Sequence, residues 1–413
     1  MHWLDRRNFR GNSDGAIGLP MAGRPNTGRP LRVAVVSSSL RRAGAEKQTA
    51  YLTRALREAG ADVRFFHLGA GGHYEDVLRQ TGVSPVRIYT PNRPLLILAR
   101  LSTALRRFGS EIAFAPQFGD LLQTGLAGRL CHALVLGGIR SDGFYELNEH
   151  GPRSRWMLRL AHGLIANSHR ARQNLAGRGV DASKIKILPN VLDLQEFDGR
   201  CRLLPPVPVG SDRVIAVAVG SLQPCKRFDR FLNALALARR KAPALLGVLA
   251  GADQGCRPAL EQQADQLGLT PQHVIFLGEC EHVPALLTQA AFLVLCSEYE
   301  GFPNVILEAM AARRPVVTTP VGDAARIVIE AQTGFVVDGV DVVGLAERMA
   351  KLALCPATRS RLGAEGRARV FREYNYESLP TRLLALFHDF ADQNRRPALS
   401  KRLRDRLLLS ETS

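Results

Sequence analysis

The chain has 413 residues, of which 46% are hydrophobic, and a formal net charge of +17 at pH 7. This length exceeds what one sheet usually holds, so two domains are expected, and no apolar run approaches the ~20 residues of a membrane-spanning helix. Seven scattered cysteines without a CxxC pair indicate neither a disulfide framework nor a zinc ribbon. The sequence therefore predicts a two-domain protein of the reducing cytoplasm.

The positive charge is unevenly distributed. Lys, Arg, Asp and Glu sum to +3 over residues 1–30, +12 over 31–190 and +2 over 191–413. A basic chain can bind nucleic acid, but these basic residues stand singly among apolar ones, without a zinc-finger, RNP-like or lysine-run pattern. We expect no nucleic-acid partner, whereas an anionic membrane surface or an anionic acceptor explains the asymmetry equally well.

The first half of the chain alternates between strands and helices. Residues 1–30 are rich in Gly, Pro, Asn and Arg without periodicity and are predicted to be a disordered leader. A buried strand over 32–36, a helix over 45–59 and a strand over 62–68 form a βαβ unit. Further strands are expected at 111–115, 133–136, 164–166 and 185–188. The alternation predicts an N-terminal domain over 31–195 with a parallel sheet covered on both faces.

The second half repeats this pattern. Residues 189–211 contain a proline-rich, non-periodic stretch and are expected to link the domains. Strands and helices then alternate again from residue 214, which predicts a C-terminal domain over 196–375. A last helical segment is expected at 379–389, within a C-terminal segment over 376–413. The predicted fold class is α/β, with two doubly wound, Rossmann-like domains.

One stretch of the N-terminal half is both basic and amphipathic. Its apolar residues recur at helical spacing among arginines with no intervening acid: Leu98, Leu101, Leu105 and Phe108 beside Arg100, Arg106 and Arg107. This pattern predicts either packing against the sheet or docking on a membrane, because amphipathicity alone does not distinguish them. Residues 401–409 form a second such stretch.

The segment 300–308 carries two carboxylates eight residues apart across a loop-to-helix junction. Gly301 allows a tight turn, Pro303 suits the first helical turn, and Pro315 stops the helix. Backbone N–H groups at this helix start attract phosphate. Glu308 lies roughly 7 Å further along the helix, a separation suited to a diphosphate and a ribose diol. A nucleotide sugar would span both carboxylates.

This segment, EGFPNVILEAMA, followed by PVVTTPVGD and TGFVVD, resembles the donor-site signature of retaining glycosyltransferases of family 4. The stretches NSHRARQNLAGRGVDASKIKILPNVLD and VGSLQPCKRFDRFLNAL resemble the domain junction and the phosphate-binding turn of that family. The resemblance covers roughly residues 31 to 390. It implies a GT-B architecture, in which two domains face across a cleft and the C-terminal helix crosses back to the first domain.

The resemblance also assigns roles to the residues of the donor segment. It implies that Glu308 binds the ribose hydroxyls and that Glu300 contacts the donor sugar. The other predicted donor-binding residues of the segment are Gly301, Phe302, Pro303 and Asn304. In the alternative interpretation, Glu300 is a solvated loop residue and Glu308 an exposed helix residue.

Lys226 follows the expected strand over 214–219, at the edge where parallel sheets bind ligands. A lysine there can neutralise a diphosphate leaving group, although it could also be a solvated loop residue. Gly220, Ser221 and Arg227 belong to the same donor-binding turn. Many family members carry Arg where this chain has Ser221, so one phosphate cation is missing, and Arg227, Arg140 or Arg41 could replace it.

Two further loops of the first domain are candidates for the site. Gly44 follows the first strand, like the glycine-rich loop of the family, or forms a simple tight turn; the segment lacks the GxGxxG of nicotinamide dinucleotide binding. Arg140 follows Gly137-Gly138 where many family members carry a catalytic-site His. It could hold acceptor or phosphate, or pair with Asp142. Asn190 is interpreted as hinge structure.

The resemblance implies a retaining transfer of sugar from a UDP- or GDP-linked donor to a hydroxyl of an acceptor glycan or lipid-linked sugar, in polysaccharide, lipopolysaccharide or glycolipid synthesis. Because the sequence has no Asp-x-Asp triplet, we expect no metal and no cofactor, with Lys226 and helix N–H groups stabilising the leaving group. The expected location is the cytoplasm, including the inner face of its membrane. The alternatives are an epimerase or phosphorylase on the same scaffold, or a nucleic-acid-binding protein.

Overall fold

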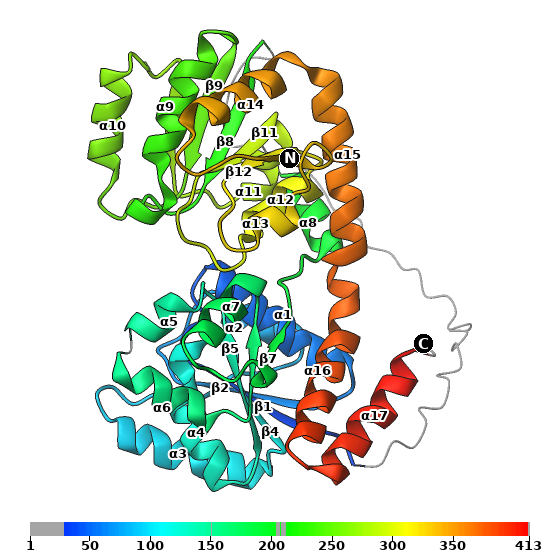
Figure 1. The fold of residues 1–413 in the computed structure, drawn as a ribbon. Coiled ribbons are helices and arrows are strands. Elements are labelled where there is room, and N and C mark those ends of the chain that lie inside the picture. Colours follow the sequence, from blue (N-terminus) through cyan, green and yellow to red (C-terminus); the bar gives the residue numbers. More distant parts are fainter. Residues whose placement is uncertain (1–28, 150, 204–206, 208–211, 412–413) are drawn as a thin grey trace, which may run out of the picture.

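The computed structural model describes residues 29–149, 151–203, 207 and 212–411. The predicted leader therefore lies almost entirely outside the described residues. Two α/β domains, each built around its own parallel sheet, face each other across a cleft (Figure 1). No helix of the described residues is long and apolar enough to cross a membrane.

The N-terminal sheet has seven strands in the order β3-β2-β1-β4-β5-β6-β7, all parallel. Its central strands are runs of small and branched apolar residues that are buried on both faces, as expected when helices cover both sides. The strands are β1 (Arg32–Ser37), β2 (Asp62–His67), β3 (Val86–Arg87), β4 (Ile112–Ala115), β5 (Leu134–Ile139), β6 (Gly163–Ala166) and β7 (Ile185–Ile187).

Seven α-helices accompany these strands in the described part of the domain: α1 (Gly44–Glu58), α2 (Tyr74–Gln80), α3 (Pro94–Phe108), α4 (Leu121–Leu130), α5 (Phe144–Glu149), α6 (Pro152–Leu160) and α7 (His169–Gly177). The basic amphipathic stretch forms α3. Its residues Leu101, Leu105 and Phe108 are buried in one cluster with residues of β1 and β4. The apolar stripe therefore belongs to the protein core, so of the two predicted alternatives packing against the sheet is confirmed, and these three side chains are not available to insert into a membrane.

The C-terminal sheet has six parallel strands in the order β10-β9-β8-β11-β12-β13. These are β8 (Val214–Val219), β9 (Leu245–Ala250), β10 (Val274–Gly278), β11 (Phe292–Leu295), β12 (Val316–Thr318) and β13 (Gly334–Val336). Separate apolar clusters fill its two faces. The main helices are α9 (Phe228–Arg239), α10 (Arg257–Gln266), α11 (Val283–Gln289), α12 (Asn304–Ala311), α13 (Ala324–Ile327) and α14 (Val342–Leu354).

The segment expected to link the domains contains a helix, α8 (Leu194–Cys201). Asp193 caps it by accepting a hydrogen bond from the Glu196 backbone N–H, and Leu194 and Phe197 are buried against the C-terminal domain. The helix was missed because its capping Asp and apolar residues stand next to a proline-rich stretch. Residues 204–206 and 208–211 of the expected linker lie outside the described residues.

The chain returns to the N-terminal domain through three helices, α15 (Pro356–Glu373), α16 (Leu379–Gln393) and α17 (Pro397–Glu411), which run down one side of the molecule (Figure 1). Leu383, Phe387 and Phe390 of α16 are buried in the same cluster as β1, and Leu403 of α17 joins them. The second basic amphipathic stretch therefore also packs its buried leucine against the core. This packing fixes the position of one domain relative to the other.

Candidate functional site

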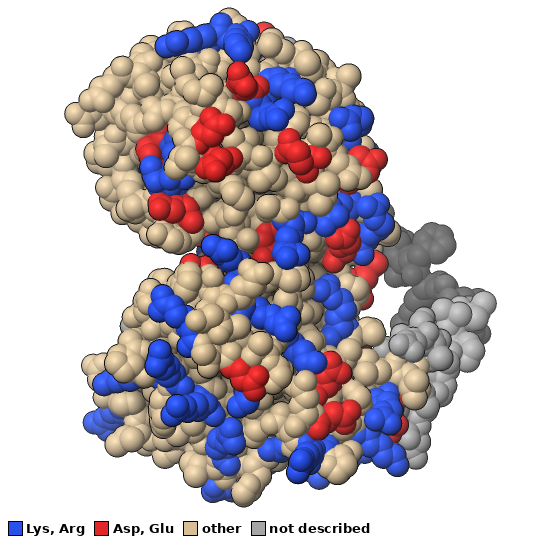
Figure 2. Space-filling model, viewed as in Figure 1, with Lys and Arg blue, Asp and Glu red and all other residues tan. Residues whose placement is uncertain are grey.

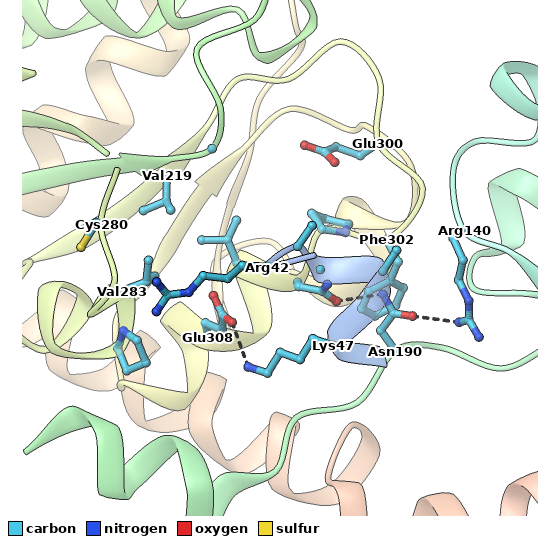
Figure 3. Close-up of a pocket in the computed structure, with 18 of the residues that line it drawn as sticks. Arg42, Lys47, Arg140, Asn190, Val219, Cys280, Val283, Glu300, Phe302 and Glu308 are labelled. Carbon is cyan, nitrogen blue, oxygen red and sulfur yellow. Dashed lines mark hydrogen bonds and ion pairs between the residues drawn. The ribbon is translucent and has the colours of Figure 1, made fainter. Parts of the chain in front are cut away.

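The cleft between the domains has a volume of about 460 Å³ and is lined by loops at the C-terminal edges of both sheets (Figure 3). Nine of the predicted site residues line it: Gly44, Arg140, Gly220, Lys226, Glu300, Phe302, Pro303, Asn304 and Glu308. Three do not. Ser221 and Arg227 lie outside the lining, and Gly301 lines a neighbouring groove instead.

Lys226 and Glu300, both of the C-terminal domain, meet on the wall of the cleft. Lys226 ends a short 3-10 turn (Pro224–Lys226) directly after β8, and Glu300 lies in the loop that joins β11 to α12. The Nζ of Lys226 is 2.6 Å from Oε1 of Glu300, which also accepts a hydrogen bond from Ser297 Oγ at 2.8 Å. Both side chains are mostly covered, at 19% and 14% exposure. A lysine held beside a carboxylate in this way is positioned to exchange its partner for phosphate.

The helix start expected to attract phosphate opens into the cleft. Pro303 occupies the N-cap position of α12 rather than its first turn, and the helix ends at Ala311, before the predicted Arg314. Arg313 adopts the left-handed conformation, with φ of 58°, which breaks the helix one turn early. Pro303 has no backbone N–H, so the first N–H groups of α12 without a partner inside the helix are those of Asn304 and Val305, and both residues lie on the cleft wall.

Glu308 lies one turn deeper on α12 and pairs with a residue of the other domain. Its Oε1 is 3.4 Å from Nζ of Lys47 on α1, and both side chains are largely covered (Figure 3). Lys47 was not predicted. A basic residue three positions after Gly44 was the available signal, but nothing in the sequence indicates that α1 approaches α12.

Gly44 allows this approach of the two helices. A Cβ at this position would lie 2.6 Å from Nδ2 of Asn304, closer than a side chain tolerates. Asn304 in turn accepts a hydrogen bond from Nδ2 of Asn190 at 2.8 Å. Asn190, expected to be hinge structure, thus lines the cleft and joins the two domains. The N-terminal ends of α1 and α12 face each other as a result.

Arg140 follows β5, and its side chain donates hydrogen bonds to two uncharged acceptors. Its Nε donates to the Pro116 carbonyl at 3.1 Å and its Nη1 to Asn190 Oδ1 at 3.3 Å (Figure 3). The alternative pairing with Asp142 is wrong, because Asp142 Oδ1 accepts from the backbone N–H groups of Phe144 and Tyr145. Burial lowers the pKa of Arg140 to about 10, which leaves the guanidinium charged at neutral pH.

Glu146 organises the loop that carries Arg140. This buried carboxylate of α5 accepts hydrogen bonds from the backbone N–H groups of Arg140 at 3.1 Å, Ser141 at 2.9 Å and Gly143 at 3.0 Å. Glu146 was not predicted, because a single acid in a short helix carries no local signal of such a role. These three hydrogen bonds stabilise the conformation in which the loop presents Arg140.

Three arginines were expected as possible replacements for the cation missing at Ser221, and two of them lie outside the cleft lining. Arg227 is engaged elsewhere: its guanidinium pairs with Asp229 at 2.8 Å and with Glu298 at 3.3 Å. Arg41 also lies outside the lining. Of the three candidates only Arg140 lines the cleft. Arg42, which was not a candidate, also lines the cleft and pairs with Glu281 of the other domain.

A carboxylate of the C-terminal domain caps a helix of the N-terminal domain outside the cleft. Asp323, which is 4% exposed, accepts hydrogen bonds from the backbone N–H groups of His169 at 2.8 Å and Arg170 at 3.1 Å, at the start of α7. The His169 Nδ1 lies 2.9 Å from the same carboxylate. These contacts hold the domains together beside the cleft. Among the described residues, no group of three or more His, Cys, Asp or Glu could hold a metal ion.

The structure is thus a two-domain α/β protein. Its two doubly wound domains turn their strand ends toward a shared cleft, which holds an open helix start and two lysine–carboxylate pairs. Comparison with known families specifies the class further. The model for glycosyl transferases group 1 matches residues 205–369, and the model for Glycosyltransferase Family 4 matches residues 42–196. The chain belongs to glycosyltransferase family 4 and has the GT-B fold.

The individual proteins that resemble this chain share a third or less of its residues over the matched region. The D-inositol 3-phosphate glycosyltransferase of Mycobacterium tuberculosis is 33% identical over 235 residues, which cover 54% of this chain and 48% of that protein. The chain thus spans about half the length of the curated relatives it matches. HepE of Anabaena, solved with UDP and glucose, is 19% identical at a TM-score of 0.76 and covers 86% of this chain and 99% of its own. Sucrose-phosphate synthase of Thermosynechococcus elongatus is 21% identical at a TM-score of 0.68, and the match covers 86% of this chain and 98% of that protein.

Proposed function

We propose that this protein is a retaining glycosyltransferase, which moves a sugar from a nucleoside diphosphate to the hydroxyl of an acceptor. The observation that carries the proposal is the sequence of groups along one cleft. Lys226 and Glu300 lie together at the strand ends, the open start of α12 follows, and Glu308 lies deeper. This order matches the diphosphate and sugar at one end of a nucleotide sugar and the ribose at the other.

Donor binding would exchange the ion pair of Lys226 for phosphate. The diphosphate would occupy the α12 start, where N–H groups and the helix dipole favour anions, and would draw Lys226 from Glu300. The released carboxylate could then accept hydrogen bonds from the sugar hydroxyls. Glu308, which pairs with Lys47, would accept hydrogen bonds from the ribose diol. The base would lie beyond the ribose, against the lining residues Cys280 and Val283.

The transfer step needs a stabilised leaving group and a proton acceptor. The bond between the anomeric carbon and the diphosphate oxygen breaks, and the acceptor oxygen bonds to the same face of that carbon. The acceptor proton passes to the departing phosphate. Lys226 and Arg140 stabilise the developing charge. Arg140 cannot serve as a base, because it remains protonated at neutral pH even with its lowered pKa. This proposal requires no metal ion.

The donor and acceptor follow from the relatives and from the charge. HepE was solved with UDP-glucose, which favours a UDP-linked donor here. Lys and Arg cover much of the visible N-terminal domain, with few acids between them (Figure 2). Because the stripe of α3 is buried, this charge would attract an anionic acceptor or membrane surface electrostatically rather than insert into a bilayer. We therefore propose a cytoplasmic enzyme of cell-surface glycan or glycolipid synthesis.

A ligand panel tests this proposal against its rivals. A ligand that binds only the folded protein raises stability by about 2.7 kcal/mol at a hundred times its Kd. We expect UDP or GDP to raise the melting temperature, and NAD and duplex DNA to leave it unchanged. Stabilisation by NAD or DNA alone would favour the other functions. Donor turnover then separates the enzymes: a transferase releases the nucleoside diphosphate, an epimerase leaves it bonded to the sugar, and a phosphorylase requires phosphate.

A further inference from the structure

A second groove adjoins the donor cleft and shares its central residues. It has a volume of about 910 Å³, within the range of small-ligand sites, and Arg140, Lys226 and Glu300 line both spaces. A nucleotide sugar in the cleft would place its anomeric carbon near these three residues. A second substrate must reach that carbon from outside the nucleotide path. The groove provides this route.

The lining of the groove suits a saccharide. Tyr145 of α5 and Tyr299 of the β11–α12 loop approach it from opposite domains, with exposures of 61% and 58%. Tyrosine combines an apolar ring with a polar tip, which matches the C–H faces and hydroxyls of a sugar ring. Asn148 and Gln223 add side-chain amides, which both donate and accept hydrogen bonds.

The charge of the groove is positive. Lys226 and Glu300 neutralise each other, and Asp142 uses one carboxylate oxygen to accept backbone N–H groups. Neither Arg140 nor Arg178 has a carboxylate partner within 4 Å among the described residues. Arg178 is exposed, and its guanidinium stacks over the ring of Phe144 at 4.9 Å. An arginine presented flat on an aromatic ring keeps its N–H donors available for carboxylate or phosphate.

We propose that this groove is the acceptor site and that it takes a saccharide bearing an anionic group, a carboxylate or a phosphate, which Arg178 recognises. The inference rests on the proposed transfer function and adds the chemical class of its acceptor. Arg178 acts as a specificity residue: it lies at the C-cap of α7, away from the shared catalytic residues. Tyr145 stacks against the sugar ring.

Binding to the nucleotide-saturated protein tests the inference. Glucuronate, glucose 6-phosphate, glucose and inorganic phosphate are titrated by calorimetry in the presence of UDP, or of GDP if that binds more tightly. Glucuronate and glucose 6-phosphate, the carboxylate and phosphate arms, should bind at least tenfold more tightly than glucose. Arg178→Gln should remove this preference, since a hydrogen bond to a charged group contributes roughly tenfold or more. Arg172→Gln, at an exposed arginine of the same helix outside the groove, should leave it intact.

The aromatic contact is tested separately. Tyr145→Ala should weaken binding of both acidic sugars and leave inorganic phosphate unaffected, whereas Tyr145→Phe should bind them as the parent does. Melting temperatures identify variants that do not fold. If Arg178→Gln is one of them, Arg178→Lys replaces it as the variant that tests the charge contact. The inference would be overturned if glucose bound as tightly as the acidic sugars, or if no acidic sugar bound at all. It would also be overturned if inorganic phosphate bound as tightly as glucose 6-phosphate, or if the two Arg→Gln variants had equal effects. Failure of every nucleotide to bind would instead reject the proposed function.

Discussion

The ribose-binding role of Glu308 yields a prediction that separates ligand contact from structure. Its carboxylate is 17% exposed and has one charged partner, Lys47, at 3.4 Å. Glu308→Gln keeps the size of the side chain but removes its charge. Losing a hydrogen bond to a charged group costs roughly 1.5–3 kcal/mol, which corresponds to a loss of about 10- to 150-fold in nucleotide affinity.

The assay compares two nucleotides on the same variant. Calorimetry with UDP should register the full loss, whereas 2′,3′-dideoxy-UDP, which lacks the ribose hydroxyls, should bind the parent protein and Glu308→Gln equally. Glu298→Gln provides a matched control, because Glu298 is an exposed carboxylate that pairs with Arg227 outside the cleft. An equal loss for both nucleotides, or no loss for UDP, would refute the ribose contact.

Three further predictions concern the leaving group, the domain interface and a buried acid. Lys226→Ala should lower turnover by about a hundredfold or more, while EDTA leaves the parent rate unchanged; strict dependence on added manganese would contradict this. Asp323→Ala should destabilise the protein by roughly 0.5–2 kcal/mol in urea titrations and enlarge its radius of gyration in solution scattering, because two backbone N–H groups at the start of α7 lose their acceptor. An unchanged radius would mean that other contacts suffice. Burial raises the pKa of Asp120 to about 6, so the folded state binds its proton more tightly than the unfolded chain does, and this group lowers stability as pH rises from about 4 to about 6. Asp120→Asn, which keeps the acceptor for Ser38 N–H, should remove that part of the pH dependence; an unchanged stability profile would argue against the raised pKa.

Local patterns were sufficient to predict the architecture. The two series of short apolar runs separated by helices predicted both parallel sheets, because buried strands of this kind need a helical crossover between them. The donor segment was equally predictable, since Gly301, Pro303 and the two acids define a loop-to-helix junction in the sequence itself. The cleft brings together most of the residues that this segment and the β8 turn suggested.

The contacts between domains were not predictable from local sequence. Lys47, Asn190 and Asp323 acquire their partners only when distant elements meet, and their neighbours in the chain give no sign of it. The position of Arg227 outside the cleft lining has a local cause: Asp229 stands two residues later and pairs with it. The two alternatives left open at α3 show the limit of amphipathic patterns, because a stripe beside arginines can face a sheet as well as a bilayer.

The stereochemistry of sugar release from UDP-glucose tests the central claim most directly. In the absence of acceptor, slow transfer to water can be followed by proton NMR, which distinguishes the α and β anomers of glucose before they interconvert. We expect that UDP is released, that α-glucose appears first from this α-linked donor, and that Lys226→Ala abolishes both signals. If β-glucose appears first, or if the wild-type protein binds UDP-glucose without releasing UDP, the proposed retaining transfer is contradicted.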